Sequence, residues 1–163
     1  GQPLPHPHTL RTKGGRLSSY DFSMITKKPT ILVVEDHEDC VYLWHRYAER
    51  VGFRLLTAHN GEDALLTVRQ ERPTLIFLDI QLPGMNGWQT LCELKGDPVT
   101  SDIPVVMCSS LNQIERAFFE GADGYVRKPM HFQEVAEWIN WAQKMQEMSD
   151  RQTITHYATC ECM

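Results

Sequence analysis

The feature that most constrains the fold is a short apolar segment, residues 74–79, that ends in a carboxylate. Its sequence is TLIFLD, and a loop containing Pro-Gly and Asn-Gly pairs follows at 80–87. A continuous apolar run of this length, closed by such a loop, is typical of a strand buried on both faces of a parallel sheet. Asp79 therefore stands at the carboxyl end of a strand, where open α/β sheets bind their ligands.

Four more strands and five helices follow from similar patterns. Each of the five strands is followed by a segment whose apolar residues recur at helical spacing. Alternating strands and helices predict an α/β fold, with a parallel sheet covered by helices on both faces and joined by right-handed crossovers. The four further strands are expected at 29–34, 53–58, 105–108 and 124–127.

The chain is long enough for one domain with tails. Its 163 residues are too few for two domains of usual size. We expect a flexible N-terminal arm at 1–28, the domain at 29–148 and a polar C-terminal tail at 149–163. No apolar run is long enough to cross a bilayer, and five cysteines without framework spacing favour a reducing cytoplasm. A net charge of −5 without a concentrated basic face argues against a nucleic-acid partner.

Polar side chains stand at the ends of four of the expected strands. Glu35 and Asp36 follow the first strand, Asp79 ends the third, Ser109 follows the fourth and Lys128 follows the fifth. We expect them to converge on one crevice, because the carboxyl ends of parallel strands meet at one edge of a sheet. Three carboxylates placed together repel one another unless a cation is present, and hard oxygen ligands with open water positions suit Mg²⁺.

This constellation suits phosphoryl transfer to a carboxylate. With Mg²⁺ and the ammonium of Lys128 beside it, Asp79 is suited to attack a phosphoryl group in line, while the hydroxyl of Ser109 holds the transferred oxygens. Taken singly, each residue has an ordinary structural reading as a helix cap, a solvated turn or a surface charge. Their joint occurrence at four strand ends favours the functional reading.

The motifs at these strand ends resemble those of the receiver domains of two-component response regulators, over about residues 28–148. The matching segments are VVED at 33–36, LDIQLPGMNG at 78–87, MCSS at 107–110 and GYVRKP at 124–129. The resemblance implies a five-stranded parallel sheet of flavodoxin-like, CheY-like order 2-1-3-4-5. The chain departs from the family between Ser109 and Tyr125, where the segment is about one helical turn shorter than a receiver domain usually has. We therefore expect the fourth helix and the loop before it to be altered.

The resemblance also implies a role for each motif residue. Asp79 is similar to the phosphoacceptor. Mg²⁺ would be held by Asp36, Asp79 and the backbone carbonyl of Gln81, with Glu35 as a further acid behind these ligands. Ser109 resembles the hydroxyl that follows the phosphate, Tyr125 the aromatic switch, and Lys128 the phosphate-binding lysine that precedes a cis proline bond.

The implied function is that of a phosphorelay response regulator. A histidine kinase or a histidine phosphotransfer protein would donate the phosphoryl group, and the domain would signal by binding a further, unidentified protein. The protein is not expected to be an enzyme beyond catalysing its own phosphorylation and dephosphorylation. Only some fifteen polar residues follow Met148, so a stand-alone regulator is expected. A phosphotransfer intermediate, a receiver fragment of a larger hybrid kinase, and a homodimer are left open.

Three other functions fit the pattern less well. A phosphatase that passes through an aspartyl phosphate resembles a motif with a second Asp two residues after the nucleophile, and Gln81 stands there. A flavin-binding protein of the same topology would need a phosphate loop after the first strand, where the acidic segment 35–39 repels phosphate. A structural pseudo-receiver is disfavoured because the acceptor, metal and lysine positions are all filled.

Overall fold

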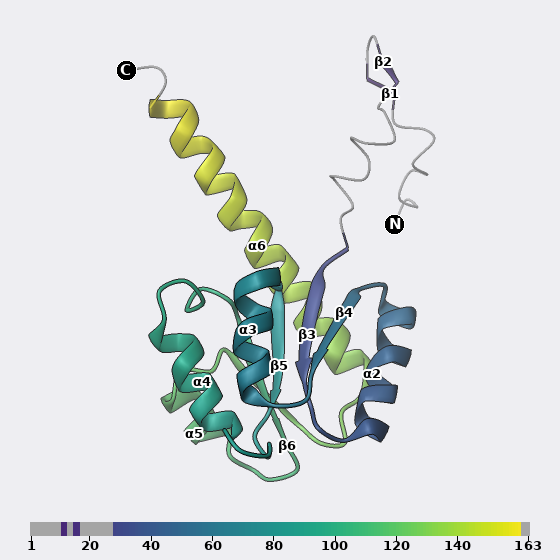
Figure 1. Cartoon of the computed structure of the whole chain (residues 1–163). Coiled ribbons are helices and arrows are strands. Elements are labelled where there is room, and N and C mark those ends of the chain that lie inside the picture. The colour runs from purple at the N-terminus through teal and green to yellow at the C-terminus, as the bar shows by residue number, and fades with distance from the viewer. Residues whose placement is uncertain (1–10, 13–14, 17–27, 161–163) are drawn as a thin grey trace.

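The structure, a computed structural model, describes residues 11–12, 15–16 and 28–160, with side chains described in 28–153 (Figure 1). Its centre is a parallel sheet of five strands in the order β4-β3-β5-β6-β7. In chain order of these five strands this is 2-1-3-4-5, which confirms the predicted fold. The strands are β3 (Thr30–Val34), β4 (Arg54–Ala58), β5 (Leu75–Asp79), β6 (Val105–Ser109) and β7 (Gly124–Arg127).

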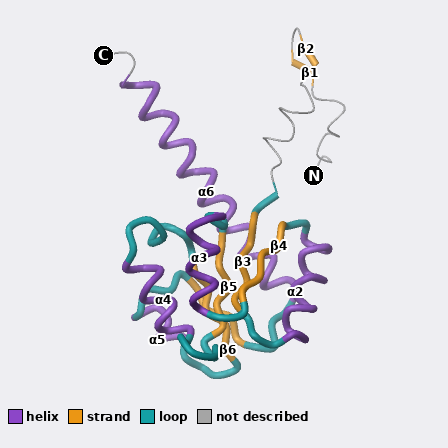
Figure 2. Tube along the Cα trace, viewed as in Figure 1, coloured by secondary structure: helices purple, strands orange, loops and turns teal. Residues whose placement is uncertain are grey.

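Helices cover both faces of the sheet (Figures 1 and 2). Helices α3, α4 and α5 pack on one face, while α2 and α6 pack on the other. This follows from the parallel connections, because each crossover must place its helix on a face of the sheet. The helices are α2 (Glu38–Val51), α3 (Gly61–Glu71), α4 (Gly87–Gly96), α5 (Ile114–Phe119) and α6 (Phe132–Cys160).

The central strand β5 is buried along its whole length, as its apolar sequence predicts. Alternate side chains enter two separate cores: Ile76 and Leu78 pack with α3, α4 and α5, while Leu75 and Phe77 pack with α2 and α6. Full burial of each such side chain contributes about 1.5–3 kcal/mol. The same alternation in β3 and β6 holds the carboxyl ends of three adjacent strands in register.

The Asn-Gly pair after β5 fixes the start of α4. The side chain of Asn86 accepts a hydrogen bond from the backbone of Gln89, whose own side chain accepts from the backbone of Asn86, so the two form a capping box. A Cβ atom on Gly87 would lie 2.3 Å from the carbonyl oxygen of Asp79. Glycine at 87 therefore lets the beginning of α4 pack directly against the end of β5.

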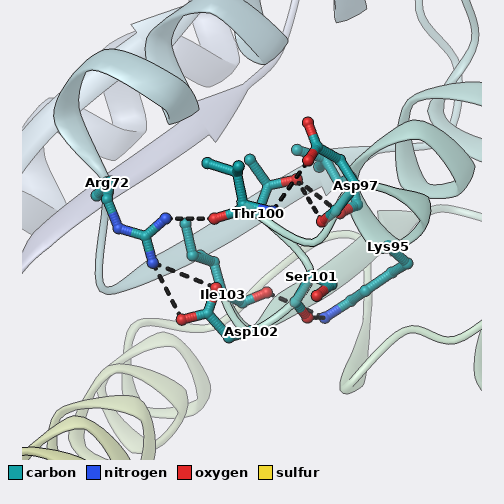
Figure 3. Close-up of polar contacts among 9 residues, drawn as sticks. Arg72, Lys95, Asp97, Thr100, Ser101, Asp102 and Ile103 are labelled. Atoms are coloured by element: carbon teal, nitrogen blue, oxygen red, sulfur yellow. Dashed lines mark hydrogen bonds and ion pairs between the residues drawn. The ribbon is translucent and has the colours of Figure 1, made fainter.

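A polar network fixes the connection between α4 and β6, at the end of the sheet opposite to the carboxyl ends of the strands (Figure 3). Arg72, which ends α3 with a positive φ of 44°, bonds to the carbonyl of Val99 and pairs with Asp102 at 3.0 Å. Lys95 donates to two carbonyls of this connection and pairs with Asp123 at 2.8 Å. These contacts join α3, α4 and β6 far from the predicted crevice.

Two expectations about the ends of the domain change. The last helix does not end near Met148: α6 continues to Cys160 and projects away from the sheet (Figure 1). Most of the expected arm at 1–28 lies outside the described residues, and four of its residues pair as antiparallel strands β1 (Arg11–Thr12) and β2 (Gly15–Arg16). None of the helices in the described part of the chain is long and apolar enough to cross a membrane.

Candidate functional site

The structure brings the predicted residues together at the carboxyl edge of the sheet. Glu35 and Asp36 follow β3, Asp79 ends β5, Ser109 ends β6 and Lys128 follows β7. Three of these polar side chains are almost fully buried, with exposed fractions of 2% for Glu35, 4% for Asp79 and 3% for Ser109. Polar groups so deeply buried need partners, and the partners come from the loops that follow the strands, among them Lys128 after β7.

Lys128 joins the two buried carboxylates. Its Nζ atom donates to Glu35 Oε2 at 2.8 Å and to Asp79 Oδ2 at 2.9 Å. Its backbone N–H donates to the carbonyl of Ser109 at 2.8 Å, which places the lysine at the end of the sheet. The peptide bond between Lys128 and Pro129 is cis, as the resemblance implied.

The pKa shifts of Glu35 and Lys128 follow from this geometry. Burial raises the pKa of Glu35, and its hydrogen bond from Lys128 offsets only part of that rise. Burial by itself would lower the pKa of Lys128, but the hydrogen bonds to Glu35 and Asp79 outweigh it and hold that pKa above its ordinary value. The lysine therefore stays charged at neutral pH.

Asp79 is held by a different donor on each oxygen. Oδ2 accepts from Lys128, and Oδ1 accepts from the backbone N–H of Gln81 at 3.0 Å. The backbone of Gln81 thus lies beside the carboxylate through its amide, while its side chain is exposed. The role predicted for the Gln81 carbonyl as a metal ligand stays a prediction.

Asp36 offers the clearest sign of a cation site. Its Oδ1 atom is buried and has no hydrogen-bond partner among the residues that the structure describes. The Asp36 side chain as a whole is 31% exposed, but a carboxylate oxygen shielded from water and without a donor favours a nearby cation. The neighbouring Glu35 and Asp79 share the ammonium of Lys128, which leaves an excess of negative charge at this edge. The donor set of carboxylate oxygens fits Mg²⁺, and Asp36 is the residue best placed to hold it.

Ser109 and Tyr125 both bond to the loop between β6 and α5. Ser109 Oγ accepts from the backbone N–H of Leu111 at 3.1 Å. The hydroxyl of Tyr125 donates to the carbonyl of Leu111 and accepts from the backbone N–H of Gln113 at 3.3 Å. One residue of this loop therefore bonds to both predicted switch residues.

Two neighbours of the site were not predicted from the sequence. His37 follows the acidic pair, and its backbone N–H donates to Glu35 Oε1 at 3.1 Å; because the bond uses the backbone, the residue type at 37 does not signal it. Tyr47 donates its hydroxyl to the carbonyl of Met130 at 3.1 Å and so holds the segment that follows Lys128. In the sequence Tyr47 is only one apolar position of a helix, and nothing there points to residue 130.

Comparison with known proteins agrees with this geometry. The family model of the response regulator receiver domain matches residues 31–140. Protein PilH of Pseudomonas aeruginosa is 34% identical over 113 residues, which make up 68% of this chain and 93% of PilH. The probable transcriptional regulator ycf27 of Pyropia yezoensis is 36% identical over 109 residues, which cover 65% of this chain but 44% of that protein.

The fold is also found among solved structures. The receiver domain of a sensor histidine kinase from Pseudomonas aeruginosa, with a magnesium ion coordinated in its active site cleft, superposes with a TM-score of 0.65. The superposition covers 71% of this chain and 98% of the solved receiver domain, at 20% sequence identity, so this similarity concerns the fold alone. Sequence match, sheet order and the residues at the strand ends agree, and the chain belongs to the response regulator receiver domain family.

Proposed function

We propose that this chain is a response regulator in which Asp79 accepts a phosphoryl group, with Mg²⁺ held by Asp36, from a partner histidine kinase or histidine phosphotransfer protein. The observation that carries the proposal is the hold on Asp79, whose two oxygens are fixed by Lys128 at 2.9 Å and by the amide of Gln81 at 3.0 Å. A nucleophile held in one orientation loses little entropy on reaching the transition state.

In the proposed transfer, an oxygen of Asp79 attacks the phosphorus of a phosphohistidine in line with the leaving nitrogen. A P–O bond forms as the P–N bond breaks, and the electron pair stays on the imidazole nitrogen, which takes a proton from solvent. Mg²⁺, when bound, offsets negative charge on the phosphoryl oxygens. Lys128 is 2.9 Å from Asp79 and supplies the second positive charge at the reacting group.

The contacts of Leu111 support a route from the site to a partner surface. Its backbone N–H bonds to Ser109 and its carbonyl accepts from Tyr125, so a change in the bonding of Ser109 moves a loop that Tyr125 also holds. Helix α5 follows this loop and exposes Phe118 and Phe119, the latter to 91%. We expect the downstream protein to bind over this short helix once the loop has moved.

The test is phosphorylation by acetyl phosphate, measured as intact mass. Wild-type protein in Mg²⁺ is expected to gain one phosphoryl group, and Asp79→Asn none. Asp97→Asn is the matched control, because Asp97 is a carboxylate paired with Arg69 at the opposite end of the sheet and should leave the gain unchanged. Equal phosphorylation of wild type and Asp79→Asn would show that the acceptor is another residue.

A further inference from the structure

His37 lies against the unpaired oxygen of the cation site. Its Nε2 atom is 4.0 Å from Asp36 Oδ1, the same oxygen that is buried without a hydrogen-bond partner among the described residues. That separation is too long for a hydrogen bond. The rest of the imidazole faces solvent, since the His37 side chain is 70% exposed.

The two atoms are within reach of a shared metal ion. Donor atoms about 2.1 Å from an octahedral ion lie about 3 Å apart when adjacent and about 4.2 Å apart when opposite. The Nε2 to Oδ1 distance of 4.0 Å is about 1 Å longer than the adjacent spacing, and rotation of the exposed imidazole can close this difference. More widely, Glu35, Asp36 and His37 each place one ligand atom within 4.8 Å of the other two.

Within this group, Glu35 is the least available ligand. Its Oε1 accepts from the backbone of His37 at 3.1 Å and its Oε2 accepts from Lys128 at 2.8 Å. Within the described ranges, Asp36 Oδ1 and His37 Nε2 have no such competing hydrogen bond. The free donors next to the strand end are therefore one carboxylate oxygen and one imidazole nitrogen.

We propose that His37 is a direct ligand of the cation bound by Asp36 and biases this site toward transition-metal ions such as Mn²⁺. This inference rests on the divalent cation of the proposed function and extends it from Mg²⁺ to a choice between ions. Mg²⁺ favours oxygen ligands and retains its water, whereas Mn²⁺ and the later divalent metals accept imidazole nitrogen readily. Replacing the imidazole should weaken Mn²⁺ binding while Mg²⁺ binding stays nearly unchanged.

The experiment measures metal binding with no phosphoryl donor present. Free Mn²⁺ is followed by its electron paramagnetic resonance signal at one fixed pH, and Mg²⁺ affinity by competition, for wild type, His37→Gln and Asp36→Asn. We expect His37→Gln to lower Mn²⁺ affinity at least about tenfold, because losing a group that only supports a metal ligand already costs about 10–100-fold. Asp36→Asn should abolish binding of both ions. His45→Gln is the matched control, since His45 is an exposed histidine farther along α2 and should change neither affinity.

A spectroscopic readout on the unaltered protein makes the result independent of the variants. Pulsed resonance spectra of bound Mn²⁺ should show coupling to a ligand nitrogen, and this coupling should change when only the histidines carry ¹⁵N. His37→Gln should lose it. Bound Mn²⁺ without nitrogen coupling, or equal Mn²⁺ affinity in wild type and His37→Gln, would overturn the inference. Phosphorylation of Asp79 in Mg²⁺ would still stand in that case, because it is measured separately.

Discussion

The ammonium of Lys128 lies 2.8 Å from Glu35 Oε2, although the two residues are 93 positions apart in the chain. The same ammonium holds Asp79 at 2.9 Å, so one side chain after β7 neutralises carboxylates at the ends of β3 and β5. Both carboxylates are buried, and water cannot replace the lysine fully. Lys128 therefore contributes to the stability of the free domain as well as to the proposed chemistry.

Lys128→Ala is predicted to destabilise the domain by about 1.5–3 kcal/mol at neutral pH, the range for a hydrogen bond to a charged group. The pKa of Glu35 is already raised by burial and should rise further without the ammonium. A raised carboxyl pKa makes the folded state less stable as pH rises, so the cost of the substitution should be small below the ordinary value of 4.5 and grow toward neutrality.

Urea unfolding of wild type and Lys128→Ala across this pH range, without divalent cations, measures the effect. Lys144→Ala, at an exposed position of α6, is the control and should cost almost nothing at any pH. A cost for Lys128→Ala that does not depend on pH would contradict the assignment of the ammonium to these two carboxylates.

Tyr47→Phe is predicted to destabilise the domain by about 0.5–1.5 kcal/mol, because it removes the hydrogen bond to the carbonyl of Met130 and leaves that carbonyl without this donor. Tyr42→Phe is the matched control on the same helix, since the hydroxyl of Tyr42 accepts a hydrogen bond from the exposed Arg46 and its side chain is 60% exposed. Thermal or urea unfolding compares the two. Equal effects would mean that the contact of Tyr47 with Met130 adds no stability.

The strands and the site residues could be predicted because their signals are local. The run at 75–79 is apolar at every position before Asp79, and the Asn86-Gly87 pair marks both the loop and the helix start. The length of α6 could not be predicted, because a mainly polar segment after Met148 is typical of a tail as well as of an exposed helix. No glycine or proline occurs between 146 and 160, so nothing local ends the helix.

The pairings across the site could not be read in the same way. These pairings depend on how distant segments meet after folding. Lys128 bonds to Glu35 as well as Asp79, and Tyr47 bonds to Met130. The type of each residue shows that its side chain can form a hydrogen bond, but it does not show which residue will be the partner. The link from Ser109 to Tyr125 through Leu111 is of this kind, because it runs through backbone atoms of a loop whose conformation has no sequence signature.

Gly124→Ala is predicted to destabilise the domain by about 1–3 kcal/mol through overpacking. A Cβ atom at 124 would lie 2.5 Å from the ring of Trp138, so this ring or helix α6 would have to shift. Trp138→Leu should recover part of this loss in the double variant. The control is Gly96→Ala, where a Cβ atom meets nothing within 4 Å, and this change should be neutral or slightly stabilising. A Gly124→Ala protein as stable as wild type would show that the strand and helix are not closely packed.

The cysteines offer a last test, of how tightly the core around the site is closed. Cys108 is buried in β6, and burial raises the pKa of its thiol, so the reactive thiolate is scarce at mildly alkaline pH. Cys92 is exposed on α4. Under iodoacetamide in native buffer, we expect the peptide containing Cys92 to be alkylated within minutes to hours, and the peptide containing Cys108 to stay unmodified until denaturant is added. Peptide mass spectrometry distinguishes the two sites within one sample, and Cys92→Ser shows that alkylation at 92 does not itself open the fold. Native alkylation of Cys108 as fast as that of Cys92 would mean that β6 opens readily. Ser109, which ends β6, and Asp79, which ends the paired strand β5, would then not stay buried.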